Sequence, residues 1–267
     1  MAYVESLMEP EKIKNGLQTD FIGREIHYFI ELSSTNDLAK ELAMKGAEEG
    51  TVIIAETQSH GRGRLGRRWI SPRGGIWFST ILRPQVSPKD ALKLTLMTAV
   101  AVAKTIGNTF NLNAEIKWPN DVLIKGRKIC GILTEMRARE NIVDFVVIGV
   151  GINANVNVDT FPEYLKRSVT SLEKEMKRDI ERERFLRALL EELERYYKIF
   201  ERNGFDIILR EWKSLSSLLG AYVEIAGFDE RIEGLAIDVD QNGALMIKAK
   251  DGTIRKVMSG DATLQKR

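Results

Sequence analysis

The chain has 267 residues, of which 43% are hydrophobic and 29% are charged, and its formal net charge is +2. This length can bury a large core, and the near-neutral charge is unlike that of proteins that bind nucleic acid through general positive charge. The single cysteine, Cys130, excludes an intrachain disulfide and a cysteine-based zinc site. Because the sequence has no hydrophobic run of transmembrane length and no signal-peptide pattern, we expect a cytoplasmic protein without membrane contact.

The first predicted elements are a strand at residues 25–30 and a helix that begins near residue 35 and ends at Gly46. Residues 1–24 are too few for a DNA-binding domain, so we expect an N-terminal extension. Residues 33–37 read Ser-Ser-Thr-Asn-Asp. Such a cluster either caps the helix or directs hydroxyl groups, amides and the positive end of the helix dipole at a ligand.

A long connection, residues 57–75, separates predicted strands at 51–55 and 76–82. We call it the ligand loop. Its segment 61–69, GRGRLGRRW, has three glycines and four arginines, and no acidic residue occurs from 57 to 89. Arginine suits carboxylate or phosphate ligands, and glycine lets the backbone approach a ligand closely. We interpret the loop as one that folds over an anionic ligand; the alternatives are a solvated basic loop and a nucleic-acid contact.

A helix and a meander of strands come next. Residues 87–90, Ser-Pro-Lys-Asp, supply an N-cap and a proline at the first helical position, so a buried apolar helix is predicted at 88–106. A turn is predicted at 137–141. A buried helix followed by short strands and short turns predicts an α+β domain with helices on one side of a mixed or antiparallel sheet. Its four short strands are predicted at residues 114–118, 122–124, 129–136 and 144–149.

The remainder of the chain divides at about residue 219. Residues 154–178 look like irregular loop, and a surface helix at 180–203 and a short helix at 205–215 follow. Residues 219–267 alternate between short strand-like runs and turns, which predicts a small separate β-barrel. The expected parts are therefore the extension at 1–24, a central domain at 25–218 and the barrel at 219–267.

Several polar and basic segments would support phosphate chemistry if they met in space. The sequence offers no Ser-His-Asp set and no prominent carboxylate pair, but it offers positive charge and one acid that could hold magnesium. Residues 149–153, Gly-Val-Gly-Ile-Asn, resemble part of a dinucleotide-binding motif, yet the third glycine and the helix are missing. The alternative is a strand end with close backbone packing.

Five segments carry a resemblance to biotin protein ligases: SSTN at 33–36, GRGRLGRRW at 61–69, KWPND at 117–121, RKICGIL at 127–133 and GVGIN at 149–153. The resemblance extends from about residue 17 to the C-terminus. It implies a catalytic domain like that of class II synthetases, followed by a small barrel of the Src-homology-3 type. Relatives that also repress transcription carry an N-terminal winged helix-turn-helix domain. The short segment before the match therefore predicts a ligase without operator binding.

The resemblance also implies a reaction in two steps. The carboxylate of biotin attacks the α-phosphate of MgATP to give biotinyl-5′-AMP and pyrophosphate, and a specific lysine of a biotin carboxyl carrier domain then displaces AMP. Biotin and ATP are substrates, Mg²⁺ is an activator, and no tightly bound prosthetic group is expected. A homodimer is expected because many relatives dimerise.

Individual roles follow from the resemblance, position by position. Lys128 and Arg64 are the expected catalytic residues, with Lys128 contacting the biotin carboxylate and the phosphate. Asp121 is the expected magnesium ligand. The expected biotin-binding residues are Ser34, Thr35, Asn36, Gln58, Arg62, Gly63, Arg64 and Lys128. The residues expected to bind ATP and the adenylate are Arg62, Arg64, Arg67, Trp69, Lys117, Asn120 and Asn153.

Two other functions remain open from the sequence. A lipoate protein ligase would share the fold and the adenylate chemistry, although the ligand loop together with residues 117–121 favours biotin. A nucleic-acid-binding module could use the basic loop and the barrel, but the near-neutral net charge argues against it.

Overall fold

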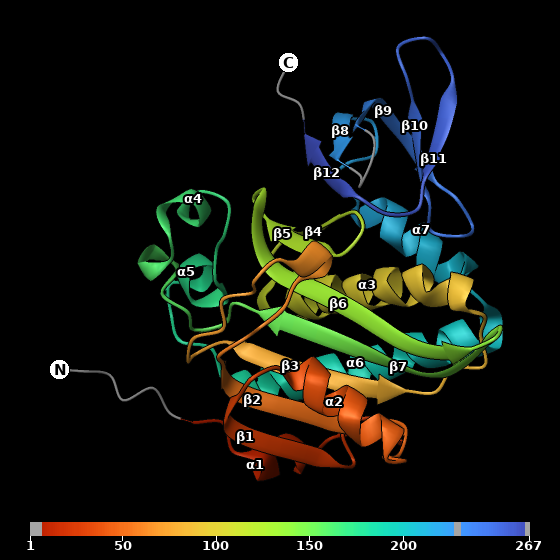
Figure 1. Ribbon diagram of the computed structural model, residues 1–267. Helices are drawn as coiled ribbons and strands as arrows, with labels where there is room; N and C mark the ends of the chain where they lie inside the picture. The colour runs from red at the N-terminus through yellow and green to blue at the C-terminus, as the bar shows by residue number, and fades with distance from the viewer. Residues whose placement is uncertain (1–6, 227–230, 265–267) are drawn as a thin grey trace.

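The computed structural model describes residues 7–226 and 231–264, which form two β-sheets with surrounding helices (Figure 1). The larger sheet has the strand order β1-β2-β3-β7-β6-β5-β4. Only β1 and β2 are parallel, so the sheet is mixed, and β4 to β7 form the predicted antiparallel meander. Its strands are β1 (Ile26–Leu32), β2 (Val52–Gln58), β3 (Ile76–Leu82), β4 (Ala114–Lys117), β5 (Asp121–Ile124), β6 (Arg127–Arg139) and β7 (Ile142–Ile152).

Strands β6 and β7 are longer than predicted, and the prediction of a turn over residues 137–141 is wrong. The chain turns only at Glu140 and Asn141, where Glu140 adopts a positive φ of 55°. Arg137 and Arg139 stay on β6 and form ion pairs with Asp144 of β7 at 3.4 and 3.1 Å. The charged residues at 137–140 resembled a loop in the sequence, because a local pattern does not show that Asp144 pairs with the two arginines across the strands.

Helices cover both faces of the large sheet. The predicted N-cap, Ser87, forms a capping box with Asp90 around a 3₁₀ turn at Pro88–Asp90, which leads into α3 (Ala91–Phe110). Helix α3 packs with α6 (Arg182–Asn203) and α7 (Asp206–Leu215) on one face. On the opposite face lies α2 (Thr35–Met44), so the expectation that helices cover one side only is incomplete. Strand β2 is apolar on both faces and can therefore be covered from both sides: Ile54 packs in the core that contains α3, and Ile53 packs against α2.

The described part of the N-terminal extension packs on the central domain. It contains α1 (Pro10–Lys14), and Met8, Ile13 and Ile22 are buried in the core. The segment expected to be irregular at 154–178 includes two short helices, α4 (Glu163–Lys166) and α5 (Leu172–Met176). None of the helices in the described ranges is long and apolar enough to cross a membrane.

The second sheet is a five-stranded antiparallel unit that packs beside α7 (Figure 1). The Trp118 indole N–H donates to the Gly243 carbonyl at 3.0 Å, and Lys213 pairs with Asp238 at 2.6 Å, so the unit is tied to the central domain. Its strands, in the order β11-β10-β9-β8-β12, are β8 (Tyr222–Ala226), β9 (Arg231–Val239), β10 (Leu245–Lys248), β11 (Ile254–Val257) and β12 (Asp261–Leu264).

Candidate active site

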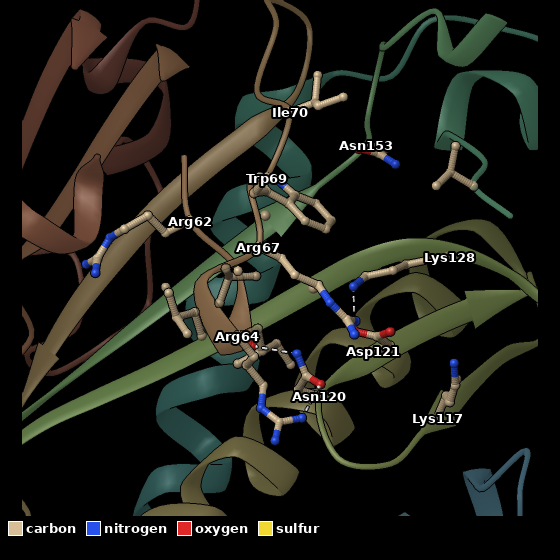
Figure 2. A pocket seen from close by; sticks show the side chains of 18 of the residues that line it. Arg62, Arg64, Arg67, Trp69, Ile70, Lys117, Asn120, Asp121, Lys128 and Asn153 are labelled. Atoms are coloured by element: carbon tan, nitrogen blue, oxygen red, sulfur yellow. Dashed lines mark hydrogen bonds and ion pairs between the residues drawn. The ribbon is translucent and has the colours of Figure 1, made fainter. Parts of the chain in front are cut away.

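A cavity of about 600 Å³ lies between the ligand loop, strands β5 to β7 and the second sheet (Figure 2). Every residue to which the sequence assigns a site role lines it, although these residues come from segments far apart in the chain. Their individual roles stay predictions. They are Ser34, Thr35, Asn36, Gln58, Arg62, Gly63, Arg64, Arg67, Trp69, Lys117, Asn120, Asp121, Lys128 and Asn153.

The ligand loop is a folded hairpin rather than an unstructured connection. The Trp69 N–H donates to the Gly61 carbonyl at 2.8 Å, and the Gly63 N–H donates to the Arg67 carbonyl at 2.7 Å. A short 3₁₀ turn at Arg64–Gly66 forms the tip. These bonds satisfy much of the loop backbone internally, which leaves the arginine side chains to contact other parts of the site.

Trp69 lies on a floor made of two glycines. Gly131 of β6 pairs with Gly151 of β7, and a Cβ atom built on Gly151 would lie 2.5 Å from the Trp69 Nε1 atom. At Gly131 the corresponding distance to Trp69 Cζ3 is 2.9 Å. Only glycine allows the indole to approach this closely. The Gly-x-Gly at 149–151 is therefore close backbone packing within β7, and the interpretation as part of a dinucleotide motif is not supported.

One end of the cavity is cationic. Lys128 Nζ lies 2.6 Å from Asp121 Oδ1 and 5.0 Å from the centroid of the Trp69 ring. Arg64 donates to Asn120 Oδ1 at 3.2 Å, and Arg67 pairs with Asp261. Burial lowers the pKa of the Arg64 guanidinium, while Asp261 and Asp121 act in the opposite direction. The guanidinium stays protonated at neutral pH, so this end attracts anions.

The other end is polar and mostly neutral. Ser34 is the N-cap residue of α2, but its side chain makes no capping bond, and Ser34, Thr35 and Asn36 are all buried beside the cavity. Gln58 Oε1 accepts from the Thr35 N–H at 2.8 Å. The buried Ser79 hydroxyl lies 2.7 Å from Thr35 Oγ1 and 2.6 Å from Asn36 Oδ1. Hydroxyl and amide groups are thus held by their neighbours beneath the cavity.

Asn153 and Trp69, which line the cavity, each have a buried polar atom without a hydrogen-bond partner in the described part of the chain. The Asn153 side chain donates from Nδ2 to the Thr170 carbonyl at 3.0 Å, but its Oδ1 has no donor. The Trp69 indole N–H likewise has no acceptor. A buried acceptor and a buried donor are costly when they are unpaired, so both are places where a ligand could form hydrogen bonds.

Arg62 differs from the other arginines of the loop. Figure 2 shows its guanidinium directed away from Arg64, Arg67 and Lys128. It lies 2.7 Å from Asp37 Oδ1 and 2.8 Å from Glu135 Oε2, on the side of the site where α2 begins.

Several residues of the site were not singled out from the sequence. Ser79 lies within an apolar strand, and Glu135 lies in the segment predicted as a strand end. Asp261 of β12 reaches Arg64 and Arg67 from the second sheet, and Arg64 also donates to the Gly260 carbonyl at 3.2 Å. A serine within the otherwise apolar run 76–82 is a weak signal that could have identified Ser79, but no local pattern connects Asp261 with the loop.

The chain matches two family models. Residues 28–153 match the biotin/lipoate A/B protein ligase family, and residues 219–264 match the biotin protein ligase C-terminal domain. The bifunctional ligase/repressor BirA of Bacillus subtilis is 38% identical over 258 residues, which cover 96% of this chain and 79% of that protein. The biotin–[acetyl-CoA-carboxylase] ligase of Mycobacterium tuberculosis is 32% identical, covering 95% of this chain and 96% of that protein.

A solved structure agrees with these matches. The biotin protein ligase from Aquifex aeolicus in complex with biotin and ATP superposes with a TM-score of 0.79 at 28% sequence identity. The superposition covers 91% of this chain and all of that one. The mixed sheet and the second, five-stranded sheet therefore have the architecture predicted from the sequence.

Proposed function

The chain belongs to the biotin/lipoate A/B protein ligase family, and we propose that it attaches biotin to a specific lysine of a biotin carboxyl carrier domain through biotinyl-5′-AMP. The observation that carries this proposal is the cavity itself, in which a buried neutral polar end faces a cationic end. The neutral end suits the ureido ring of biotin, and the cationic end suits a carboxylate beside phosphates.

In the first step, a carboxylate oxygen of biotin attacks the α-phosphorus of ATP, and the bond to the bridging oxygen breaks as pyrophosphate leaves. Negative charge develops on the phosphate oxygens, where Lys128 and Arg64 would stabilise it. Lys128 is paired with Asp121 at 2.6 Å, so its ammonium would exchange this carboxylate for the ligand. No general base is needed, because the attacking carboxylate is already ionised at neutral pH.

Binding roles follow from the chemistry of each end of the cavity. Ser34, Thr35 and Gln58 offer hydroxyl and amide groups to the ureido ring. Asn153 offers its unpartnered Oδ1 to a donor such as the amino group of adenine, and Trp69 offers an aromatic face to the adenylate. Arg67, Lys117 and Asn120 would serve the phosphates and the nucleotide from the loop, from the end of β4 and from the β4–β5 turn.

Magnesium is part of the proposal through Asp121. Among the described residues, no three His, Cys, Asp or Glu side chains gather as a complete metal site. One carboxylate nevertheless fits Mg²⁺, which proteins usually hold with one or two carboxylates while substrate phosphates and water complete the shell. When bound, the ion would neutralise phosphate charge beside Asp121.

In the second step, the amine of the carrier lysine attacks the carbonyl carbon of the mixed anhydride, and AMP leaves as the amide forms. The lysine ammonium first gives a proton to water, and the second proton that the nitrogen loses as the amide forms also passes to solvent. We further propose that the enzyme acts in the cytoplasm, where ATP is available, and that it acts as a homodimer. Sedimentation equilibrium tests the homodimer separately from the reaction.

The direct test is transfer of radiolabelled biotin to a purified carrier domain in the presence of ATP and Mg²⁺, with lipoate as competitor. We expect transfer that requires biotin and is insensitive to lipoate. Transfer of lipoate instead of biotin would identify the chain as a lipoate ligase. A nucleic-acid function is disfavoured because the formal net charge of the chain is only +2.

A further inference from the structure

Glu135 joins two parts of the site that are distant in sequence. It lies on β6, where Gly131, Leu133 and Glu135 alternate onto the same face of the sheet. Gly131 and Leu133 line the cavity, and Glu135 continues this row toward the start of α2. The Glu135 carboxylate accepts from Asn36 Nδ2 at 2.9 Å and pairs with Arg62 at 2.8 Å and Lys40 at 2.9 Å.

Arg62 is therefore held by two carboxylates at once. Its Nη2 atom contacts Glu135 Oε2 and Asp37 Oδ1, and Lys40 contacts both acids as well, at 2.9 and 3.1 Å. Burial raises the pKa of Glu135, but bonds from Asn36 and Lys40 and the charge of Arg62 outweigh burial and leave the net pKa below its ordinary value. Glu135 is thus ionised at neutral pH, and the contact with Arg62 is an ion pair.

The same arrangement uses both N–H donors of the Asn36 side-chain amide. One Nδ2 hydrogen bonds Glu135, the other bonds the Leu133 carbonyl at 3.2 Å, and Ser79 donates to Oδ1. An amide has two N–H donors, so neither remains for a ligand. Asn36 packs against the backbone of Gly149, where a Cβ atom would lie 2.0 Å from its Oδ1. Asn36 is held as a part of the cavity wall.

We infer that Glu135 is a positioning residue of the site: with Asp37 it anchors the Arg62 guanidinium on the α2 side of the cavity, away from Arg64, Arg67 and Lys128, which fixes the base of the ligand loop, and it orients the Asn36 amide. Strand β6 then holds the loop at two points, through Trp69 on Gly131 and through Arg62 on Glu135. This role for Arg62 differs from the direct contact with biotin and adenylate that the family resemblance implies. The consequence for catalysis rests on the proposed function, whereas the anchoring itself does not.

The anchoring is tested on the loop without any substrate. Arg62→Ala, Glu135→Gln and the double variant are compared by the rate of thermolysin cleavage before Leu65, which is exposed at the tip of the loop. Each single variant should raise the cleavage rate by about threefold or more, and the double variant should add little, because the two residues act through one contact. Unchanged rates, or two effects that multiply independently, would overturn the inference.

Two further variants keep this test interpretable. Glu41→Gln is the matched control. Glu41 lies on α2, the helix that also carries Asp37, but it pairs with Lys45 at 2.6 Å on the exposed surface. It should leave cleavage unchanged. If Glu135→Gln fails to fold, Asp37→Asn carries the test, because it removes one of the two carboxylates from Arg62 at a half-exposed position. It should raise cleavage less than Arg62→Ala does, and an unchanged rate would count against anchoring.

Steady-state kinetics separates anchoring from direct ligand contact. If Arg62 anchors the loop, Arg62→Ala and Glu135→Gln should raise KM for biotin and KM for ATP by similar factors. If Arg62 binds phosphate, Arg62→Ala alone should raise KM for ATP, and the inference is wrong. A wild-type chain that lacks biotin-dependent activity would contradict the proposed function, while the cleavage experiment would still decide the anchoring.

Discussion

At the residue scale, the chemistry of the cavity depends most on Lys128. Its ammonium already lies beside an aromatic face and a carboxylate, both of which hold a cation without enclosing it. Lys128→Ala should reduce the single-turnover rate of adenylate formation about 10²- to 10³-fold, because one preorganised charge at a transition state contributes on this scale. Lys125→Ala is the control, since Lys125 is exposed on the neighbouring turn. A near-wild-type rate for Lys128→Ala would contradict its assigned role.

The glycine floor beneath Trp69 makes a second residue-scale prediction. Gly151→Ala would place a Cβ atom 2.5 Å from Trp69 Nε1, so the indole must move. We expect a higher KM for ATP and a loss of about 1–3 kcal/mol in the free energy of unfolding, measured by urea denaturation. Gly107→Ala is the control, because its nearest neighbour is 3.7 Å away and alanine favours its helix α3. Unchanged KM and stability in Gly151→Ala would show that the position of Trp69 does not depend on glycine at residue 151.

The residues found from the sequence and those missed differ in a physical way. Arg64, Lys128 and Asn153 lie in short segments whose composition is unusual for a loop or a strand end, so they stand out locally. Ser79 and Glu135 sit in ordinary strands and gain their importance only from partners across the sheet. A partner of that kind depends on register, which one-dimensional patterns do not contain.

At the element scale, the ligand loop is fixed by contacts at its tip as well as at its base. Arg64 donates to Asn120, Gly260 and Ser259. Arg64→Gly removes these contacts and adds backbone freedom at the tip. We expect biotinyl-5′-AMP to escape into solution and to label lysines of proteins that are not carriers, measured by mass spectrometry of a bystander protein.

The matched control for this change is Arg73→Gly. Arg73 belongs to the same loop but is exposed and does not line the cavity. It should retain selective labelling of the carrier. If Arg64→Gly is as selective as the parent chain, the loop does not retain the intermediate.

Among the groups that join the N-terminal segment to helix α6 is a buried carboxylate, Glu194. Glu194 accepts hydrogen bonds from the backbone N–H groups of Asp20, Phe21 and Ile22. Burial raises the pKa of Glu194, but these bonds and Lys198 outweigh burial and leave the net pKa below the ordinary value of 4.5. A carboxyl with a lowered pKa stabilises the fold above its unfolded pKa, and this contribution is lost as the pH falls through the folded pKa.

Stability should therefore fall with acid below about pH 4.5, and part of that fall should belong to Glu194. Glu194→Gln should lose about 1–3 kcal/mol of unfolding free energy at neutral pH and show a flatter acid dependence. Urea denaturation across this range measures both quantities, with the exposed Glu41→Gln as control. The same acid dependence in Glu194→Gln and the parent would show that the carboxylate is not linked to folding.

The elements themselves were largely predictable because their hydrophobic periods are strong. The apolar helix α3 with its capping box, the amphipathic α6 and the hairpin turns of the barrel all follow from local chemistry. The second layer formed by α2 was not predicted, since the moderate apolar face of that helix does not say which side of a sheet it covers. The extent of β6 and β7 depended on ion pairs between strands.

At the scale of the whole molecule, the cavity is assembled from both sheets. Asp261 lies on β12, yet it contacts Arg64 and Arg67 of a loop almost two hundred residues earlier in the sequence. The sequence predicts the barrel as a separate unit and gives no sign of this contact. The position of the second sheet relative to the central domain depends on a few side chains such as Trp118 and Asp261. Their partners can be identified only in the folded protein.

The proposed function requires that this cavity forms biotinyl-5′-AMP. Exchange of labelled pyrophosphate into ATP measures that step alone, without a carrier protein or a homodimer assumption. We expect exchange that depends on biotin, is not supported by lipoate and is lost in Lys128→Ala while Lys125→Ala keeps it. Exchange that depends on lipoate and not on biotin, or equal exchange in Lys128→Ala and the parent chain, would contradict it.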